Sequence, residues 1–264
     1  MKFRCTSLEN VIGGCPLRYL IESRGAISPS SEAATRGTNT HTLLEYAVKG
    51  ETDQLKHMLS QLSTDKYYTF YIACLNHFTT WLNEYDVQVL VAEKKYFIEH
   101  TLKDNTRVTL TGKPDLIAKI KIDNVYYNTI VDYKTSMSPK ESDLYKYQII
   151  WYAYMAQTIG EIPIQKVAIL NFSGGSKTVK KSFIYRDLQQ ADLDWLMQII
   201  EYTNALEKRG YFQKNYNGGC SWCDFKDICK QLPETVNINT HEDLLNQLIA
   251  KHNTDLQTPG LINL

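Results

Sequence analysis

Four consecutive segments with a β-strand pattern, and no helical segment between them, most strongly constrain the fold of this chain. They cover residues 87–98, 107–112, 114–122 and 126–135, and apolar, β-branched and aromatic residues recur in them. Asp123 and Asn124 separate the last two segments and predict a tight turn there. The centre of the chain is therefore expected to form a strand meander.

Helical patterns flank this meander on both sides. Before it, helices are expected at residues 7–24, with Ser7 as N-cap, at 38–48 and within 53–84. After it come a long helix at 143–160, a strand at 166–173, a pairing strand at 180–186 and a helix at 187–210. This order predicts an α/β (α+β) fold with a central mixed sheet flanked by helices.

Composition sets limits on function without pointing to one. The chain has 264 residues, and its 29 basic and 29 acidic side chains give a net charge of zero. A surface that binds nucleic acid would therefore have to be a local basic patch. No apolar run approaches the roughly 18 residues of a membrane span, and no signal peptide is visible, so a cytoplasmic location is expected. Six cysteines in such a protein favour metal binding or catalysis over disulfides.

The segment Asp132-Tyr133-Lys134 at the end of a predicted strand carries a candidate site. Residues i and i+2 share one face of a strand, so Asp132 and Lys134 are expected to point the same way. Asp115, from the neighbouring strand, can reach the same point. Two carboxylates suit Mg²⁺ or Mn²⁺, and a lysine beside the metal can orient the attacking water. Asp-x-Lys alone is common on solvated strands, so the combination with Pro114-Asp115 is the sharper signal.

This combination resembles the PD-(D/E)XK nuclease superfamily: Pro114-Asp115, sixteen residues, then Asp132-Tyr133-Lys134. The segment RGTNTHTLLE resembles the Gly-x-x-x-His motif of the RecB-like branch, Gly112 matches its hairpin glycine, and YKYQIIWYAYMA matches its Gln-x-x-x-Tyr motif. The resemblance implies a restriction-endonuclease-like fold. It implies Asp115, Asp132 and Lys134 as catalytic residues, His41, Asp115, Asp132 and the Tyr133 carbonyl as metal ligands, Gln148 and Tyr152 as substrate-binding residues, and Glu93 and Glu45 as weaker candidates.

The cysteines form a second candidate metal site. Cys220, Cys223 and Cys229 follow the spacing Cys-x₂-Cys-x₅-Cys, for which zinc is the default interpretation. Cys15-Pro16 resembles the opening of RecB-like nucleases that carry an iron–sulfur cluster, the AddB-type subunits and the Cas-four nucleases. That resemblance implies a 4Fe-4S cluster that joins the N- and C-terminal segments, with ligands Cys15, Cys220, Cys223 and Cys229. Cys5 is a competing ligand, and Cys74 is expected to be a small buried hydrophobe.

The resemblance extends from Ser7 to Lys230. It implies one nuclease domain over residues 1–232 and a tail at 233–264 with a possible helix at 240–251. It also implies a Mg²⁺- or Mn²⁺-dependent exonuclease at DNA ends, on single strands or flaps, in recombination, repair, or CRISPR or phage DNA processing. A helicase, a recombinase or a CRISPR adaptation protein would be its partner, and a phage-encoded protein would act in the host cytoplasm. A non-catalytic DNA-end-binding or assembly subunit and a zinc-ribbon interaction protein are the alternatives.

Overall fold

A five-stranded mixed sheet lies at the centre of the computed structural model, which describes residues 2–4, 8, 10–11, 14–135, 139–159, 162–175 and 178–257. Its strand order is β2-β5-β6-β7-β8, and β6 and β7 are parallel while the other neighbours are antiparallel. The strands are β2 (Gln88–Ala92), β5 (Leu116–Ile122), β6 (Val125–Lys134), β7 (Lys166–Gly175) and β8 (Thr178–Asp187). The expected mixed sheet flanked by helices is confirmed.

The predicted turn between β5 and β6 is present and explains their register. Asp123 and Asn124 have positive φ angles of 50° and 64°, as a two-residue hairpin of type I′ requires, and these residue types tolerate that region. Ile122 then pairs with Val125, and the ladder runs on to Leu116 opposite Val131.

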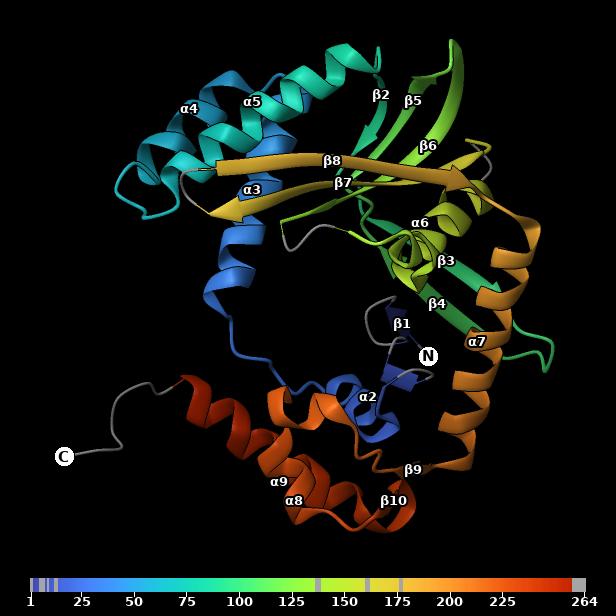
Figure 1. Cartoon of the computed structure of the whole chain (residues 1–264). Coiled ribbons are helices and arrows are strands. Elements are labelled where there is room, and N and C mark those ends of the chain that lie inside the picture. Colours follow the sequence, from blue (N-terminus) through green and yellow to red (C-terminus); the bar gives the residue numbers. More distant parts are fainter. Residues whose placement is uncertain are drawn as a thin grey trace.

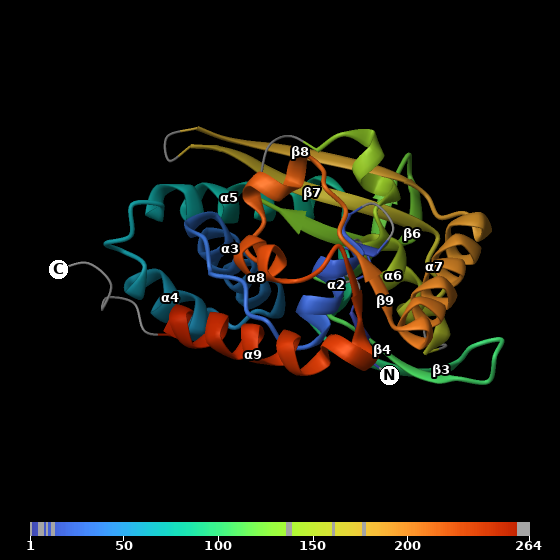
Figure 2. The same ribbon diagram turned by 90° about the horizontal axis from the view of Figure 1, so that it is seen from below.

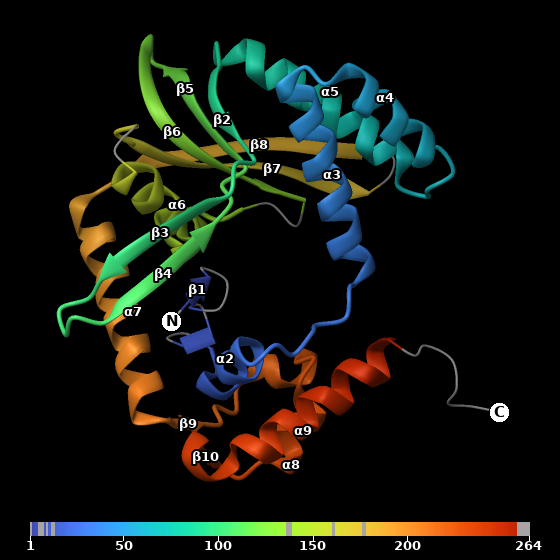
Figure 3. The ribbon, with the colours of Figure 1, turned by 180° about the vertical axis from the view of Figure 1, so that it is seen from behind.

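Helices cover both faces of the sheet, so its central strands β5, β6 and β7 are largely buried on both sides. On one face lie α3 (Glu32–Lys49), α4 (Thr52–Gln61) and α5 (Tyr68–Glu84), and on the other lies α6 (Tyr147–Thr158), against which α7 (Gln190–Arg209) packs (Figures 1 and 3). Successive residues of β6 accordingly belong to different core clusters: Ile130 to the α6 side and Val131 to the α5 side. Such two-sided burial accounts for the apolar character of the central strands.

Residues 87–98 do not form one strand, which corrects the expected meander. The chain turns at Glu93, whose φ is 54°, a backbone region unfavourable for most side chains. The segment before it is β2 of the large sheet. The segment after it, β3 (Tyr96–Thr101), joins a separate three-stranded sheet of order β1-β4-β3, with β1 (Lys2–Arg4) and β4 (Arg107–Gly112).

The helical expectations hold with altered boundaries. The predicted helix at 7–24 is interrupted at Gly14 and Cys15, and α2 spans Pro16–Ser23 with proline in its first turn; Ser7 lies outside the described residues. The helix expected at 38–48 begins earlier, at Glu32, because Ser31 caps it by accepting the Ala34 N–H at 3.1 Å. The stretch 53–84 holds two helices, and the stretch 143–160 holds the 3₁₀ segment η1 (Glu141–Tyr145) followed by α6.

The two ends of the described chain lie together, below the main sheet in Figure 1. There α2 lies beside α8 (Lys226–Gln231) and α9 (Ile238–Gln257), and β9 (Tyr211–Gln213) pairs with β10 (Thr235–Asn237) (Figures 1 and 2). Leu245 and Ile249 of α9 are buried in the same core cluster as Leu20 of α2. The helix expected at 240–251 is thus present and longer. No helix in the described part is long and apolar enough to span a membrane.

Candidate functional site

Asp132 and Lys134 form an ion pair at the carboxyl end of β6. Lys134 Nζ lies 2.7 Å from Asp132 Oδ2, and the Asp132 side chain is only 4% exposed. They alternate with Tyr133, which is buried in the core on the α5 side. The two therefore share the sheet face that α6 covers, as the spacing predicts.

Asp115 ties the start of β5 to the end of β6. Its Oδ2 accepts the backbone N–H of Tyr133 at 2.6 Å, and its Oδ1 lies 3.1 Å from His41 Nδ1. Asp115 is 7% exposed. Through these two contacts, the Asp115 carboxylate links α3, which carries His41, to the end of β6, which carries Asp132.

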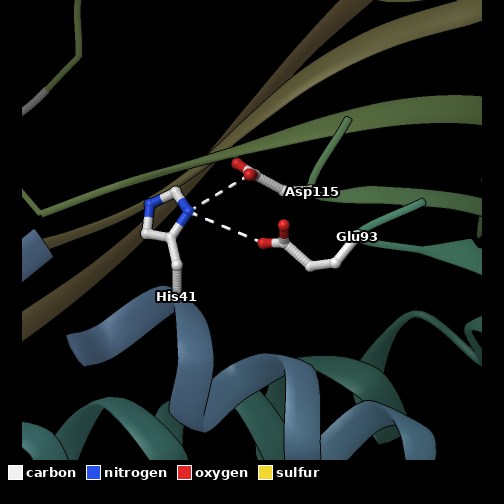
Figure 4. Close-up of side chains that lie close together, drawn as sticks. All are labelled: His41, Glu93 and Asp115. Atoms are coloured by element: carbon white, nitrogen blue, oxygen red, sulfur yellow. Dashed lines mark hydrogen bonds and ion pairs between the residues drawn. The ribbon is translucent and has the colours of Figure 1, made fainter. Parts of the chain in front are cut away.

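Glu93, a weaker candidate in the sequence, lies beside His41 and Asp115 in the structure. Ligand atoms of His41, Glu93 and Asp115 lie within 4.8 Å of one another (Figure 4). Glu93 Oε1, 3.8 Å from His41 Nδ1, is buried and has no hydrogen-bond partner among the residues that the structure describes. The positive φ of Glu93 turns the chain after β2, and strain of this kind is often found at functional sites.

Lys113 is a site residue that the sequence interpretation missed. Its ammonium lies 2.6 Å from Glu93 Oε2 and 3.8 Å from Glu45 Oε2. One feature of the sequence could have indicated it: in Gly112-Lys113-Pro114-Asp115, Lys113 lies two residues before a candidate catalytic acid. Glu45 lines the same surface hollow as His41, Glu93 and Lys113, with a volume of about 300 Å³.

The electrostatics of this group favour a bound cation. Burial, with the charge of Asp115, raises the pKa of Glu93 to about 7. Burial also raises the pKa of Asp132 to about 6, where the repulsion from Asp115 is opposed by Lys134. Burial alone would lower the pKa of His41, but Asp115, Asp132 and Glu93 together raise it. Crowded carboxylates, a neighbouring imidazole and an unpartnered carboxylate oxygen fit a divalent metal such as Mg²⁺ or Mn²⁺.

Gln148 and Tyr152 of α6 connect to the lysine. Lys134 Nζ donates to Gln148 Oε1 at 3.1 Å, and Gln148 Nε2 donates to Tyr152 Oη at 3.1 Å. Trp151, on the same helix, donates its indole N–H to the Thr111 carbonyl at 3.1 Å, which holds α6 against β4. The Gln-x-x-x-Tyr spacing thus places both polar groups on one helix face.

Tyr133 contributes through its backbone and its ring. Its N–H is donated to Asp115, and its ring lies edge-on to Phe78 and His41 at centroid distances of 5.6 Å and 5.7 Å. Burial raises the pKa of its hydroxyl well above the ordinary value. The expected role of its carbonyl as a metal ligand stays a prediction.

Four cysteines from the two ends of the chain line one cavity of about 710 Å³. Cys15 precedes α2, Cys220 lies in η2 (Gly218–Trp222), Cys223 follows it, and Cys229 lies in α8. Burial, with the neighbouring thiols of the other three, raises the pKa of Cys229. The structure therefore brings Cys15 to the C-terminal cysteines across more than 200 residues.

The other two cysteines stand apart from this cavity or from the described chain. Cys74 is fully buried in the core on the α5 side, and burial raises the pKa of its thiol to about 12. Its expected role as a small buried hydrophobe is confirmed. Cys5 lies outside the described residues. All the described cysteines are free, as the sequence led us to expect.

Comparison with known families identifies the group to which this site belongs. The sequence model of the PD-(D/E)XK nuclease superfamily matches residues 6–230, a range that contains every candidate site residue from Cys15 to Cys229. The chain belongs to the PD-(D/E)XK nuclease superfamily. As in other PD-(D/E)XK nucleases, a divalent metal ion is the expected cofactor of the acidic site, and its acids and lysine are present here in a mixed sheet flanked by helices.

Two solved structures are similar to this PD-(D/E)XK nuclease. One is the crystal structure of SSO0001, with 16% sequence identity and a TM-score of 0.42, covering 88% of this chain and 87% of that chain. The other is a candidate exonuclease from Eubacterium rectale, with 13% identity and a TM-score of 0.46, covering 76% of this chain and 81% of that chain. No curated protein matches the sequence.

Proposed function

We propose that this nuclease is a Mg²⁺- or Mn²⁺-dependent deoxyribonuclease that hydrolyses phosphodiester bonds at DNA ends, as an exonuclease acting on single strands or flaps. One observation carries the proposal. Buried Asp115 and Asp132, the unpartnered oxygen of Glu93, and the ammonium of Lys134 converge at the end of two neighbouring strands. A purely structural module would gain nothing from burying three acids so close together.

The side chains of this site suit phosphodiester hydrolysis. Asp115, Asp132, His41 and Glu93 would hold the metal, which when bound stabilises negative charge on a phosphate and lowers the pKa of water. Asp132 and Gln148 hold Lys134 from two directions, so its ammonium is directed at the site and can orient a water molecule or offset phosphate charge. Gln148 and Tyr152 would contact the DNA strand from α6.

The decisive experiment is a cleavage assay on 5′- and 3′-labelled single-stranded, double-stranded and flapped DNA. We expect stepwise release of nucleotides from at least one kind of end with Mg²⁺ or Mn²⁺ and none with EDTA. Wild-type protein that leaves every one of these substrates intact with both metals would overturn the proposal, and it would favour a non-catalytic subunit that only binds DNA ends.

The biological setting is proposed from the resemblance to RecB-like nucleases. We expect action in recombination, repair, or CRISPR or phage DNA processing, beside a helicase, a recombinase or a CRISPR adaptation protein. Affinity purification from the native cell, with and without nuclease digestion of DNA, would identify such a partner. A partner unrelated to DNA metabolism would contradict this setting.

The cysteine cavity is proposed to hold a 4Fe-4S cluster between Cys15, Cys220, Cys223 and Cys229. The proposal is supported by the position of Cys15, which lines the same cavity of about 710 Å³ as the three C-terminal cysteines. A single zinc ion held by the same four thiolates is the alternative.

Metal binding at the acidic site is expected to stabilise the fold. Because Mn²⁺ relieves repulsion among buried carboxylates of the native state only, a concentration of 100 times Kd should add about 2.7 kcal/mol and raise Tm by about 5–10 °C. Thermal denaturation with and without Mn²⁺ measures this. Glu93→Gln should reduce the shift, whereas Glu99→Gln, an exposed position on β3, should leave it unchanged. An equal shift in all three proteins would contradict the assignment of Glu93 to this site.

Tyr152 is expected to act through Gln148. Tyr152→Phe removes the oxygen that accepts from Gln148, so Gln148 no longer holds Lys134 in one orientation, and kcat should fall by about tenfold. Tyr154→Phe is the matched control, since the Tyr154 hydroxyl lies 2.9 Å from His100 on β3, away from the acids. Equal kcat values for the two variants would speak against this role.

A further inference from the structure

Asn171 on β7 is buried, yet its side-chain amide is unpartnered. Its exposure is 0%, and neither Oδ1 nor Nδ2 has a hydrogen-bond partner within the described chain. An amide can donate two hydrogen bonds and accept others. Buried polar groups are nearly always satisfied by protein or by ordered water, because an unsatisfied one is costly. A partner other than the described side chains, such as ordered water, is therefore expected.

The amide lines a small cavity beside the catalytic lysine. The cavity has a volume of about 60 Å³, well above the roughly 10–15 Å³ that one water molecule requires. It is too small for a nucleotide, since ligand sites are typically of about 300 Å³ or more. Asp132, Lys134, Gln148 and Asn171 are among the residues that line it. Water is the ligand that fits both the polarity and the size.

Strand register places Asn171 next to Lys134. In the parallel pair of β6 and β7, Lys134 is opposite Asn171, and in the antiparallel pair of β7 and β8, Asn171 is opposite Ser182. These three residues form one polar row across the sheet face that α6 covers. Lys134 and Asn171 line the cavity, whereas Ser182 does not.

We infer that Asn171 is a positioning residue for DNA cleavage, which holds water in this cavity against Lys134. A water molecule there can accept a hydrogen bond from the Lys134 ammonium and donate one to Asn171 Oδ1. Asp132 and Gln148 contact the ammonium from other directions, and the water held by Asn171 adds a further contact that restricts where Lys134 points. The inference rests on the proposed nuclease function and assigns a residue that neither the Asp-x-Lys nor the Gln-x-x-x-Tyr motif contains.

A purely structural role leads to a different expectation. An amide that makes no hydrogen bond within the protein contributes little to stability, so an apolar residue of similar shape should be neutral or stabilising there. Under our inference the same replacement keeps or raises Tm but slows cleavage. Stability and activity should thus separate in one variant.

The experiment compares Asn171→Leu and Asn171→Ala with wild type in the full chain. For Asn171→Leu we expect kcat to fall by about 10–100-fold, with the KM for DNA and the Mn²⁺ affinity unchanged and Tm equal or higher. Asn171→Ala leaves room for an additional water in place of the amide, so its loss of kcat should be smaller. Ser182→Ala is the matched control, because Ser182 Oγ is also buried, has no hydrogen-bond partner in the described part of the chain and does not line the cavity. Its kcat should equal that of wild type.

Wild-type kcat in both Asn171 variants would overturn the inference while leaving the proposed function intact. The same holds if Ser182→Ala slows cleavage as much as Asn171→Leu does, because the cavity would then be irrelevant. If Asn171→Leu does not fold, Asn171→Ala decides by the same criterion. Wild-type protein without nuclease activity would overturn both the function and the inference.

Discussion

Lys134→Met is expected to lower the rate of DNA cleavage by about 1,000-fold, the range in which positioned proton-transfer and charge-stabilising groups contribute. The methionine keeps the apolar stem and removes the ammonium that lies 2.7 Å from Asp132 and 3.1 Å from Gln148. Asp132→Asn should have an effect of the same size, because the amide keeps the shape but loses the charge that a metal requires. Single-turnover cleavage with Mn²⁺ measures both.

If both variants still bind DNA, their lower cleavage rate reflects a loss of catalysis and not a loss of substrate binding. Both variants should bind labelled DNA in Ca²⁺ or EDTA with affinity close to that of wild type, since the site contributes only part of the contact surface. Lys181→Met, a lysine on β8 that pairs with Glu84, is the control and should cleave normally. Cleavage by Lys134→Met at the wild-type rate, in protein freed of contaminating nuclease, would refute the assignment of the active site.

Cys15→Ser is expected to cause the largest loss of stability. If Cys15, Cys220, Cys223 and Cys229 hold a cluster, removal of the N-terminal ligand releases it and separates α2 from α8. Loss of a structural metal site is among the few single changes that cost more than about 4 kcal/mol, and for a chain of this size Tm should fall by about 10 °C. Anaerobically purified wild type should be brown, and Cys15→Ser pale and less stable.

Cys74→Ala provides the matched control for the cysteine cavity. Cys74 is fully buried in the core on the α5 side and takes no part in that cavity, so this variant should keep its colour and its iron content. Iron and sulfide analysis of both variants completes the comparison. One zinc ion per chain and no iron in anaerobically prepared wild type would contradict the cluster and favour a zinc site.

Local sequence patterns were sufficient to predict how candidate site residues of the same helix or strand lie relative to one another. The two-residue spacing of Asp132 and Lys134 places them on one strand face, and the four-residue spacing of Gln148 and Tyr152 places them on one helix face. Asp123-Asn124 predicted the hairpin turn because few residues tolerate positive φ there. In each case the periodicity of an element or the steric preference of a residue determines the geometry.

Tertiary structure decided the features that depend on contacts between distant segments. Glu93 was a weaker candidate in the sequence, where it lies within the segment 87–98 that was expected to be one strand. Only the turn at Glu93, which sends β2 and β3 into different sheets, directs its carboxylate at His41. Lys113 became a site residue for the same reason, through its contact with Glu93.

The sequence by itself determined which candidate groups are present: two acids and a lysine at the ends of two strands, and three C-terminal cysteines whose spacing suits a metal. The tertiary structure decided the contacts between distant segments that no local pattern or motif specifies, because burial and non-local packing have no periodic signature. It packs α9 into the core beside α2, and it leaves Asn171 buried next to Lys134 without a hydrogen-bond partner in the described chain. A motif specifies which side chains are present and how they lie within one helix or strand. The packing of the whole core determines which distant side chains lie next to them.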